Sequence, residues 1–192
     1  YLHPSNAGFS SSVSPHQGRP MPAIIRVAVP EDAQRLPAIE ISAAQAFRMI
    51  DGLSWLAESP PMSVEQHRQR IALSTCWVAL NAENRPQGFL SAARHGNDLH
   101  IYELSVMHAV QGQGWGRRLV EAAKDYARAN RLSFVTLTTF TSVPWNAPFY
   151  ARLGFQIKAT ADLDQRLAAV VSEEYQHGFA PGSRCAMAWP VA

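Results

Sequence analysis

The fold is decided by one continuous stretch, which reads His100-Ile-Tyr-Glu-Leu-Ser-Val-Met-His-Ala-Val-Gln-Gly-Gln-Gly-Trp-Gly-Arg-Arg-Leu119. It predicts a strand that runs directly into a glycine-rich loop and then into a helix. Glycines let the backbone approach a ligand closely, and free N–H groups at a helix start attract anions. Arg117 and Arg118 add positive charge at the same point. The stretch therefore predicts a binding loop for phosphate groups.

Two common phosphate loops do not fit this sequence. The glycines at 112, 114 and 116 alternate as G-x-G-x-G, whereas the dinucleotide loop reads G-x-G-x-x-G and follows a first strand. The nucleoside triphosphate loop needs Gly-Lys-Ser/Thr, which is absent here. A nucleotide-binding protein of another fold is kept only as a distant alternative, which predicts protection by ATP or NAD.

The loop instead resembles the acetyl-CoA loop of the GNAT acetyltransferase superfamily, Gln/Arg-x-x-Gly-x-Gly/Ala, at Gln111, Gly114 and Gly116. A glycine-rich turn that merely lets helix and sheet pack is the alternative. A second family signature, a helix carrying Phe-Tyr-x-x-x-Gly-Phe, is similar to residues 149–155. Two signatures in the family's order favour the resemblance, which covers residues 24 to about 158.

The second signature departs from the family pattern at one position. The family often has an Asn seven residues before the Tyr, where this chain has Val143. Asn146 is more simply interpreted as the N-cap of the helix, because Pro148 suits the first turn that follows.

The resemblance implies a GNAT fold, an α/β (α+β) domain with a splayed, mostly antiparallel mixed sheet and about four flanking helices. It places the pyrophosphate of CoA on the loop N–H groups and the pantetheine arm along the strand before the loop. The strands at 100–106 and 134–138 would splay apart, and one strand N–H would polarise the thioester carbonyl. Acetyl-CoA is then a co-substrate, and no metal is expected. The residues expected to bind it are Leu104, Ser105, Val106, Gln111, Gly112, Gln113, Gly114, Trp115, Gly116 and Arg117.

Acetyl transfer to an amine needs a base for the ammonium, stabilisation of the carbonyl oxygen and a proton for the departing thiolate. The resemblance assigns the last task to Tyr150, although a tyrosine packed in the core is the alternative. No activated Ser or Cys is visible near the motifs, so direct transfer in a ternary complex is expected. The family resemblance places the base at a position matching His100 or Tyr102.

Two side chains compete for the role of the base. Regular strand alternation puts His100, Tyr102 and Leu104 on one face and Glu103 on the other. A free histidine pKa near 6.5 suits a base at neutral pH, so His100 ranks first. Glu103 would need a β-bulge to turn inward, or could act from the opposite side of the cleft. Proton relay by bulk water is a third possibility.

Further strands and helices are expected along the rest of the chain. Pro30 starts a helix in which Leu36, Ile39, Ala43 and Phe47 share one face, with Pro37 kinking or delaying it. Ser63 and Gln66 form a capping-box pattern that opens a helix at 63–73. The other expected helices are 117–130, 147–153 and 162–175, and the other strands are 24–29, 76–80, 89–94, 99–106, 134–138, 155–158 and 185–189.

Length and composition limit the class of protein. The 192 residues suffice for one domain, expected at 21–192, while residues 1–20 are interpreted as a disordered leader or an added extension. A hydrophobic content of 47% excludes wholesale disorder. A net charge of +2 with scattered basic residues argues against nucleic acid, and no apolar run of membrane-spanning length is present. Two cysteines, Cys76 and Cys185, are too few for a disulfide framework and indicate a cytoplasmic protein.

The acceptor is expected to be a small-molecule primary amine. A protein N-terminus or lysine is the alternative acceptor, and a homodimer is possible. A non-catalytic acyl-CoA-binding regulatory module is the alternative from another functional class. His67 is expected to be solvated on a polar helix face.

Overall fold

The computed structural model describes residues 24–192, so the expected leader at 1–20 lies outside the described residues. Seven strands form one sheet in the order β1-β2-β3-β4-β5-β7-β6. Neighbouring strands are antiparallel except β4 and β5, which are parallel. The strands are β1 Ile24–Val27, β2 Cys76–Leu80, β3 Pro86–His95, β4 Asp98–Val106, β5 Phe134–Phe140, β6 Gln156–Ile157 and β7 Arg184–Pro190.

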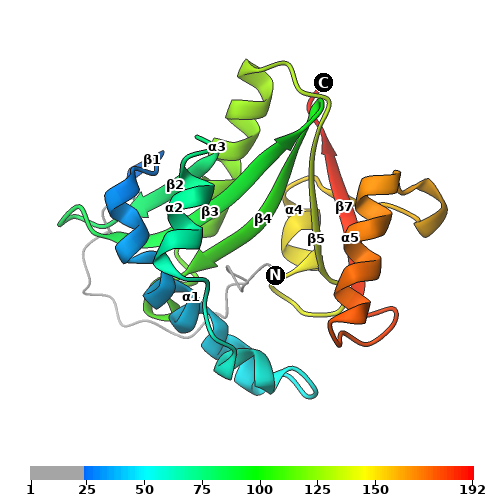
Figure 1. Cartoon of the computed structure of the whole chain (residues 1–192), viewed down its shortest axis with the longest axis horizontal. Helices are drawn as coiled ribbons and strands as arrows, with labels where there is room; N and C mark the ends of the chain where they lie inside the picture. Colours follow the sequence, from blue (N-terminus) through cyan, green and yellow to red (C-terminus); the bar gives the residue numbers. More distant parts are fainter. Residues whose placement is uncertain (1–23) are drawn as a thin grey trace, which may run out of the picture.

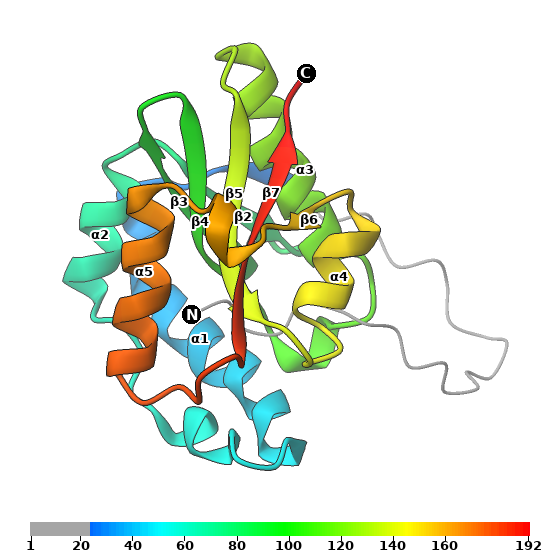
Figure 2. The same cartoon turned by 90° about the vertical axis from the view of Figure 1, so that its right-hand side faces the viewer.

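Helices cover both faces of this sheet. In Figure 2, α1, α2 and α5 lie on one side and α3 and α4 on the other. The described α-helices are α1 Leu36–Ala44, α2 Val64–Ile71, α3 Trp115–Ala129, α4 Ala147–Arg152 and α5 Gln165–Gln176. The predicted fold class, a mixed and mostly antiparallel sheet flanked by helices, is confirmed.

Helix α3 has the apolar pattern that the sequence predicts, although it begins at Trp115, two residues before the predicted start. Leu119, Val120, Ala123 and Ala127 are fully buried against the sheet, as the apolar spacing requires. Asn130 is the C-cap, and its side-chain amide donates to the carbonyl of Tyr126 at 2.9 Å. This helix anchors the loop that precedes it.

The other helix boundaries differ from the predictions in two places. The first helix is divided, because residues 30–34 form a 3-10 turn and α1 begins only at Leu36, with Pro37 in its first turn. The last helix begins at Gln165 instead of residue 162, because the Asp164 side chain accepts from the Leu167 N–H at 2.8 Å and caps it. The predicted capping box of α2 forms, with Ser63 and Gln66 each accepting the other's backbone N–H.

The parallel strands β4 and β5 separate part-way along their length. Their pairing runs from Asp98↔Phe134 to Ile101↔Leu137 and ends there. Both strands continue, β4 to Val106 and β5 to Phe140, and Figure 1 shows them diverging. The predicted splaying is therefore confirmed, and the second half of β4 has no strand partner on its β5 side within the described residues.

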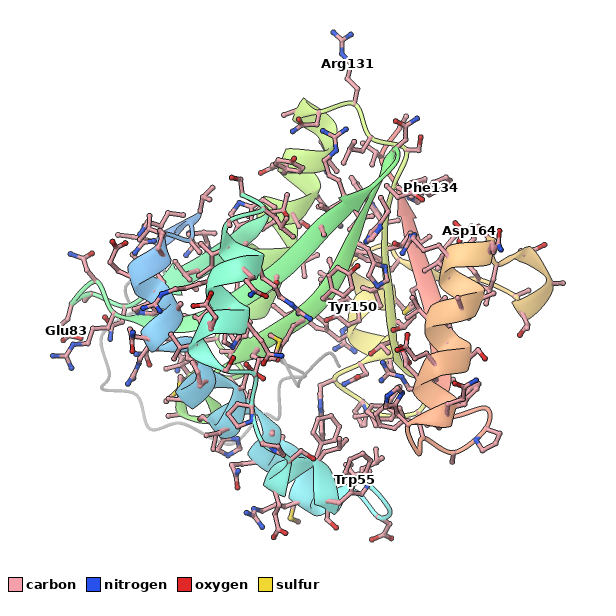
Figure 3. The ribbon with its side chains drawn as sticks, in the orientation of Figure 1. Trp55, Glu83, Arg131, Phe134, Tyr150 and Asp164 are labelled. Carbon is pink, nitrogen blue, oxygen red and sulfur yellow. The ribbon has the colours of Figure 1, made fainter. Side chains whose placement is uncertain are left out.

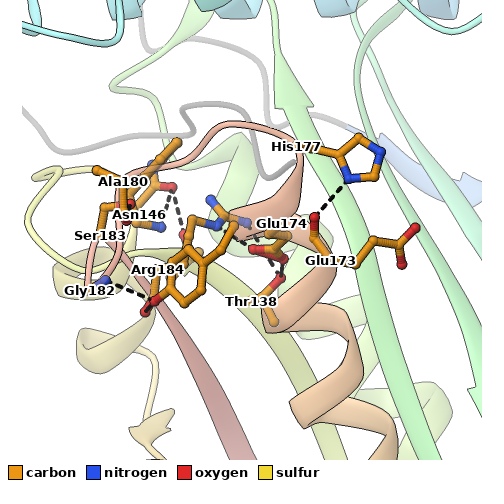
Figure 4. Close-up of polar contacts among 12 residues, drawn as sticks. Thr138, Asn146, Glu173, Glu174, His177, Ala180, Gly182, Ser183 and Arg184 are labelled. Atoms are coloured by element: carbon orange, nitrogen blue, oxygen red, sulfur yellow. Dashed lines mark hydrogen bonds and ion pairs between the residues drawn. The ribbon is translucent and has the colours of Figure 1, made fainter.

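Helix α5 is fixed across the far strands by a buried ion pair. Arg184 Nε on β7 donates to the Glu174 carboxylate at 2.5 Å, and the Thr138 hydroxyl on β5 bonds the other oxygen of that group (Figure 4). The Tyr175 hydroxyl donates to the Arg184 carbonyl at 3.2 Å. These contacts join α5 to the strands on the β5 side of the split.

Core truncation should weaken the β3–β4 half of the sheet. Leu90 is fully buried on β3, so Leu90→Ala removes apolar contacts and leaves a cavity. We expect the free energy of unfolding to fall by about 3 kcal/mol in urea titration. Leu73→Ala, at a side chain that is 56% exposed, is the matched control and should change it by less than about 0.5 kcal/mol. Equal losses in the two variants would contradict this assignment of the core.

Candidate active site

The glycine-rich loop follows the open end of β4. A short 3-10 turn, His108–Val110, connects β4 to the loop, and the Gln111 side chain donates to the Val106 carbonyl at 3.0 Å. Gly112 and Gly114 have φ angles of 85° and 84°, in the left-handed region that favours glycine. Gly114 is the N-cap of α3, and the first bond of the helix runs from Arg118 N to Gly114 O at 3.1 Å.

This geometry leaves polar hydrogens available at the start of α3. The first N–H groups of a helix have no acceptor within it, and the helix dipole makes that end positive. Gly112, Gln113 and Arg117 are exposed there, and a Cβ built on Gly114 would meet no atom within 4 Å. The Trp115 side chain is buried in the core instead, so only its backbone faces the loop. The arrangement suits an anion.

A β-bulge in β4 overturns the predicted alternation of its side chains. Ala92 pairs with Ile101 and Ser91 with Glu103, so Tyr102 has no partner on β3. The extra residue moves every later side chain of β4 to the face opposite the one that regular alternation gives it. Leu104 therefore packs in the core under α3, on the same face as Ile101. Glu103 therefore shares the opposite face with His100, and the prediction that they lie on different faces is wrong.

His100 lies where the two strands are still paired. It is the β4 partner of Thr136, and its Nδ1 is 2.9 Å from the Thr136 hydroxyl. Burial, reinforced by the charge of Arg166, lowers the pKa of His100 to about 3. The ring is therefore neutral at physiological pH and is a weak proton acceptor.

Glu103 lies beyond the last paired residues, where the strands have begun to part. Burial, reinforced by the nearby Glu40 carboxyl group, raises the pKa of Glu103 to about 8. Glu40 comes from α1, and the Nε2 of His67 on α2 bonds its carboxyl group. His67 is 1% exposed, so its predicted place on a solvated face is wrong.

Sequence reasoning missed Glu40, although a signal was present. Glu40 stands four residues after Leu36 and beside Ile39, within the apolar stripe of α1 that faces the sheet. A carboxylate in such a stripe requires a buried polar partner, because burying it alone is costly. No partner could be named without the fold, since His67 and Glu103 lie on other elements.

Tyr150 lies on α4, and Asn146 is the residue just before that helix. Figure 3 shows Tyr150 between the diverging parts of β4 and β5, and its ring packs against Phe149 and Phe155. Asn146 is the N-cap residue of α4, as predicted, but its side chain makes no cap bond. It instead accepts from the Thr139 hydroxyl at 2.6 Å and from the Phe140 N–H at 3.3 Å, fixing α4 to β5.

Two hollows in the surface have contrasting linings. One, of about 190 Å³, has Glu40, Glu103 and Arg70 among its polar lining. Its apolar lining consists of Ile41, Ala44, Leu56, Pro60, Pro61 and Met62. We call this hollow the carboxylate pocket. The second, of about 350 Å³, has an aromatic lining of Trp55, Phe140 and Phe179 and no carboxylate except Asp51.

Within residues 24–192, no three His, Cys, Asp or Glu side chains are grouped so that they could hold a metal ion. None of the helices described there is long and apolar enough to span a membrane.

The acetyltransferase (GNAT) family matches residues 43–155 of the chain. The chain belongs to the GNAT acetyltransferase family. This membership makes it an acetyl-CoA-dependent acyltransferase. The match spans both signatures and the whole of the β4–loop–α3 unit.

Solved structures share the fold at low sequence identity. The PaiA N-acetyltransferase of Thermoplasma acidophilum, in complex with coenzyme A, is 18% identical with a TM-score of 0.65, over 88% of this chain and 99% of that chain. A phosphinothricin acetyltransferase of Sinorhizobium meliloti, in complex with AcCoA, is 17% identical with a TM-score of 0.62, over 88% of this chain and 89% of that chain. The ribosomal-protein-S18-alanine N-acetyltransferase of Escherichia coli is 18% identical with a TM-score of 0.59, over 88% of this chain and 94% of that chain.

The buried neutral ring of His100 should make stability depend on pH. The pKa of His100 is about 3 in the folded protein and near 6.5 when unfolded, so below pH 6.5 the unfolded chain binds the extra proton. The contribution of His100 to the free energy of unfolding therefore falls by roughly 1.5 kcal/mol as the pH is lowered from 6.5 to 5.

His100→Asn should remove that part of the acid destabilisation, measured as the free energy of unfolding in urea at each pH. His108→Asn, at an exposed histidine of the loop, is the control and should leave the wild-type slope. A wild-type slope retained in His100→Asn would contradict the buried neutral state.

Proposed function

We propose that this enzyme transfers the acetyl group of acetyl-CoA directly to the primary amine of a small molecule, in a ternary complex. The observation that carries the proposal is the juxtaposition of an anion-binding helix start with the opened half of β4. A diphosphate on the loop and an extended arm along β4 would follow a single continuous path. Acetyl-CoA combines those two features, and it supplies an activated acyl group.

The residues of the loop fit the diphosphate of CoA. Gly114 leaves open space where a side chain would stand, and the backbone N–H groups of residues 112–117 would bind the phosphates. Arg117 and Arg118 add positive charge. In the strand that precedes the loop, the free edge of β4 at Leu104, Ser105 and Val106 would pair with the amides of the pantetheine arm. The other residues expected to line this path are Gln111, Gly112, Gln113, Trp115 and Gly116.

The carboxylate pocket supports the acceptor side. A primary amine arrives as an ammonium ion, and carboxylates attract it and can remove its proton. The pocket is lined by two carboxyl groups, by Arg70 and mostly by apolar side chains. A small amine with an apolar body matches this lining, whereas the aromatic hollow offers no comparable pair of acids.

We assign the base to Glu103 and the acid to Tyr150. Glu103 takes a proton from the ammonium, and the freed amine attacks the thioester carbon. An N–H of the β4 edge stabilises the carbonyl oxygen as charge develops. When the C–S bond breaks, Tyr150 donates its proton to the thiolate sulfur. The second proton that the nitrogen loses as it becomes an amide returns to the Tyr150 oxygen. Glu103 is preferred to His100, because the His100 ring is engaged where β4 and β5 are paired and its lowered pKa makes it a weak base.

A protein acceptor is the second candidate. The similar fold of the Escherichia coli enzyme that acts on the alanine of ribosomal protein S18 motivates it. The small volume of the carboxylate pocket favours a small molecule. An assay panel of alkylamines, arylalkylamines and a peptide with an N-terminal alanine separates the two, and faster turnover of the peptide would contradict our choice.

Binding of CoA should depend on the glycine at the helix start. Gly114→Ala puts a methyl group where the diphosphate would approach, so we expect CoA affinity to fall at least tenfold in calorimetry. Gly96→Ala is a matched control, because Gly96 also has a positive φ, 59°, and open space around it. Both variants should lose about 1 kcal/mol of stability from backbone strain. An equal loss of CoA affinity in both would contradict the assignment.

Turnover should depend on the proposed acid and base. We expect Tyr150→Phe and Glu103→Gln each to lower kcat by about 100-fold, because general acid or base catalysis is removed. The KM for acetyl-CoA should change little. Thiol release in the presence of the amine panel measures both effects, and Tyr126→Phe on α3 is the control. CoA binding without thiol release from the wild type under any condition would support a non-catalytic acyl-CoA-binding module instead.

A further inference from the structure

We propose that Glu40 and His67 are positioning residues that act with Glu103 as a single proton-accepting unit for the acceptor amine. This inference rests on the proposed function, in which Glu103 is the base. It adds two residues from helices α1 and α2 that neither family signature contains.

The three side chains come from three elements and meet in the interior. Glu40 is 5% exposed, His67 1% and Glu103 4%. The Nε2 of His67 bonds Glu40 Oε1, and the Met62 N–H donates to Glu40 Oε2 at 3.3 Å. Both oxygens of Glu40 are therefore engaged, and its carboxyl group is held in one orientation beside Glu103.

The two carboxyl groups lie within hydrogen-bonding reach of each other. Two carboxylates cannot both remain charged at that separation, so one proton is shared between them. The pair then carries one negative charge and can accept one further proton. Burial and the neighbouring acid hold the pKa of Glu103 high, which makes it a stronger base than an exposed glutamate.

The other ionisable side chains around the pair include His67, Cys76 and Arg70. Burial lowers the pKa of His67, so its ring is neutral. Cys76 on β2 is a neutral thiol, because burial raises its pKa to about 12. Arg70 on α2 is the cation that faces the pair, and its guanidinium lies 5.1 Å from the centre of the Tyr102 ring.

Buried hydroxyl groups on the same face provide a second observation. Ser91 pairs directly with Glu103 across the strands, and Ser105 lies two residues beyond it. Ser91 is 1% exposed and Ser105 fully buried, yet neither hydroxyl has a hydrogen-bond partner within residues 24–192. Buried hydroxyls of this kind are normally satisfied by water or ligand. They therefore indicate a polar space beside Glu103 that an amine or a relaying water can occupy.

A purely structural role explains the cluster less well. Burying ionisable groups is costly, and apolar residues of similar size are often as stabilising or more so. Both carboxyl groups also line the carboxylate pocket, where the acceptor is proposed to bind. The arrangement is suited to receiving a proton from that pocket.

The proton balance of the unit is simple. Before transfer, the pair shares one proton and carries one negative charge. The ammonium nitrogen loses one proton to Glu103, so the pair becomes neutral and the amine acquires its lone pair. After the amide has formed, one proton leaves the pair to water, which restores its charge for the next cycle. Glu40 and His67 determine the pH at which this exchange occurs.

Glu40→Gln tests the unit, because it keeps the shape and the bond from Met62 but removes the shared proton and the charge. Without the neighbouring acid, the pKa of Glu103 should fall, because the Glu40 group raises it. The acid limb of the pH profile of kcat/KM should therefore shift to lower pH by about one unit. The KM for acetyl-CoA should stay unchanged. Glu65→Gln, at an exposed carboxylate on α2, is the matched control and should leave the profile unchanged.

His67→Leu is the second variant and guards against a folding defect in the first. The Nε2–H of His67 donates to Glu40 Oε1 and so favours the charged form of the carboxyl pair. Removing this donor should move the acid limb to higher pH, opposite to Glu40→Gln. Opposite shifts in two folded variants would support the unit. A loss of kcat with the acid limb unmoved in both would overturn it, because a structural defect lowers activity without moving that limb.

Failure of this inference is distinguishable from failure of the proposed function. If the wild type releases no thiol with any amine, the proposed function fails and this inference fails with it. If Glu103→Gln lowers kcat as expected while the acid limb of Glu40→Gln and His67→Leu matches the wild type, only this inference fails.

Discussion

The parallel strands β4 and β5 exchange backbone hydrogen bonds only as far as Ile101 and Leu137 and then separate, although both continue. Backbone N–H and C=O groups inside a protein require partners, so an open strand edge at the centre of a sheet is costly unless a ligand or water pairs with it. The rest of the structure maintains this opening. Helix α3 holds one side through its buried apolar face, and the Glu174–Arg184 pair helps to hold α5 on the other.

The bulge at Tyr102 has a second consequence at the same place. Because of the bulge, Leu104 packs in the core under α3 and Glu103 faces α1 and α2, at the point where β4 and β5 separate. In this way one extra residue supplies both an apolar support for the strand and a carboxyl group on the opposite face. Bulges often re-aim side chains next to active sites, which agrees with the role proposed for Glu103.

The sequence predicted most of the fold, because its local signals were strong. The glycines at 112–116, the apolar stripe of α3 and the box of Ser63 and Gln66 each predicted their own local structure. Regular alternation failed at Tyr102, since the bulge depends on pairing with β3 and leaves no mark in β4 alone. His67 was misplaced on a solvated face because its partner Glu40 is 27 residues away. A site assembled from α1, α2 and β4 becomes visible only when the packing is known.

The proposed acetyl transfer requires coenzyme A to lie on the loop and along the free edge of β4. Amide hydrogen exchange followed by mass spectrometry, with and without coenzyme A, tests this directly. We expect exchange to slow in the segments covering 104–106 and 112–117, and to change little in β1 and β2 on the far side of the sheet. Unchanged exchange in both segments, or slowing confined to a different surface, would contradict the account.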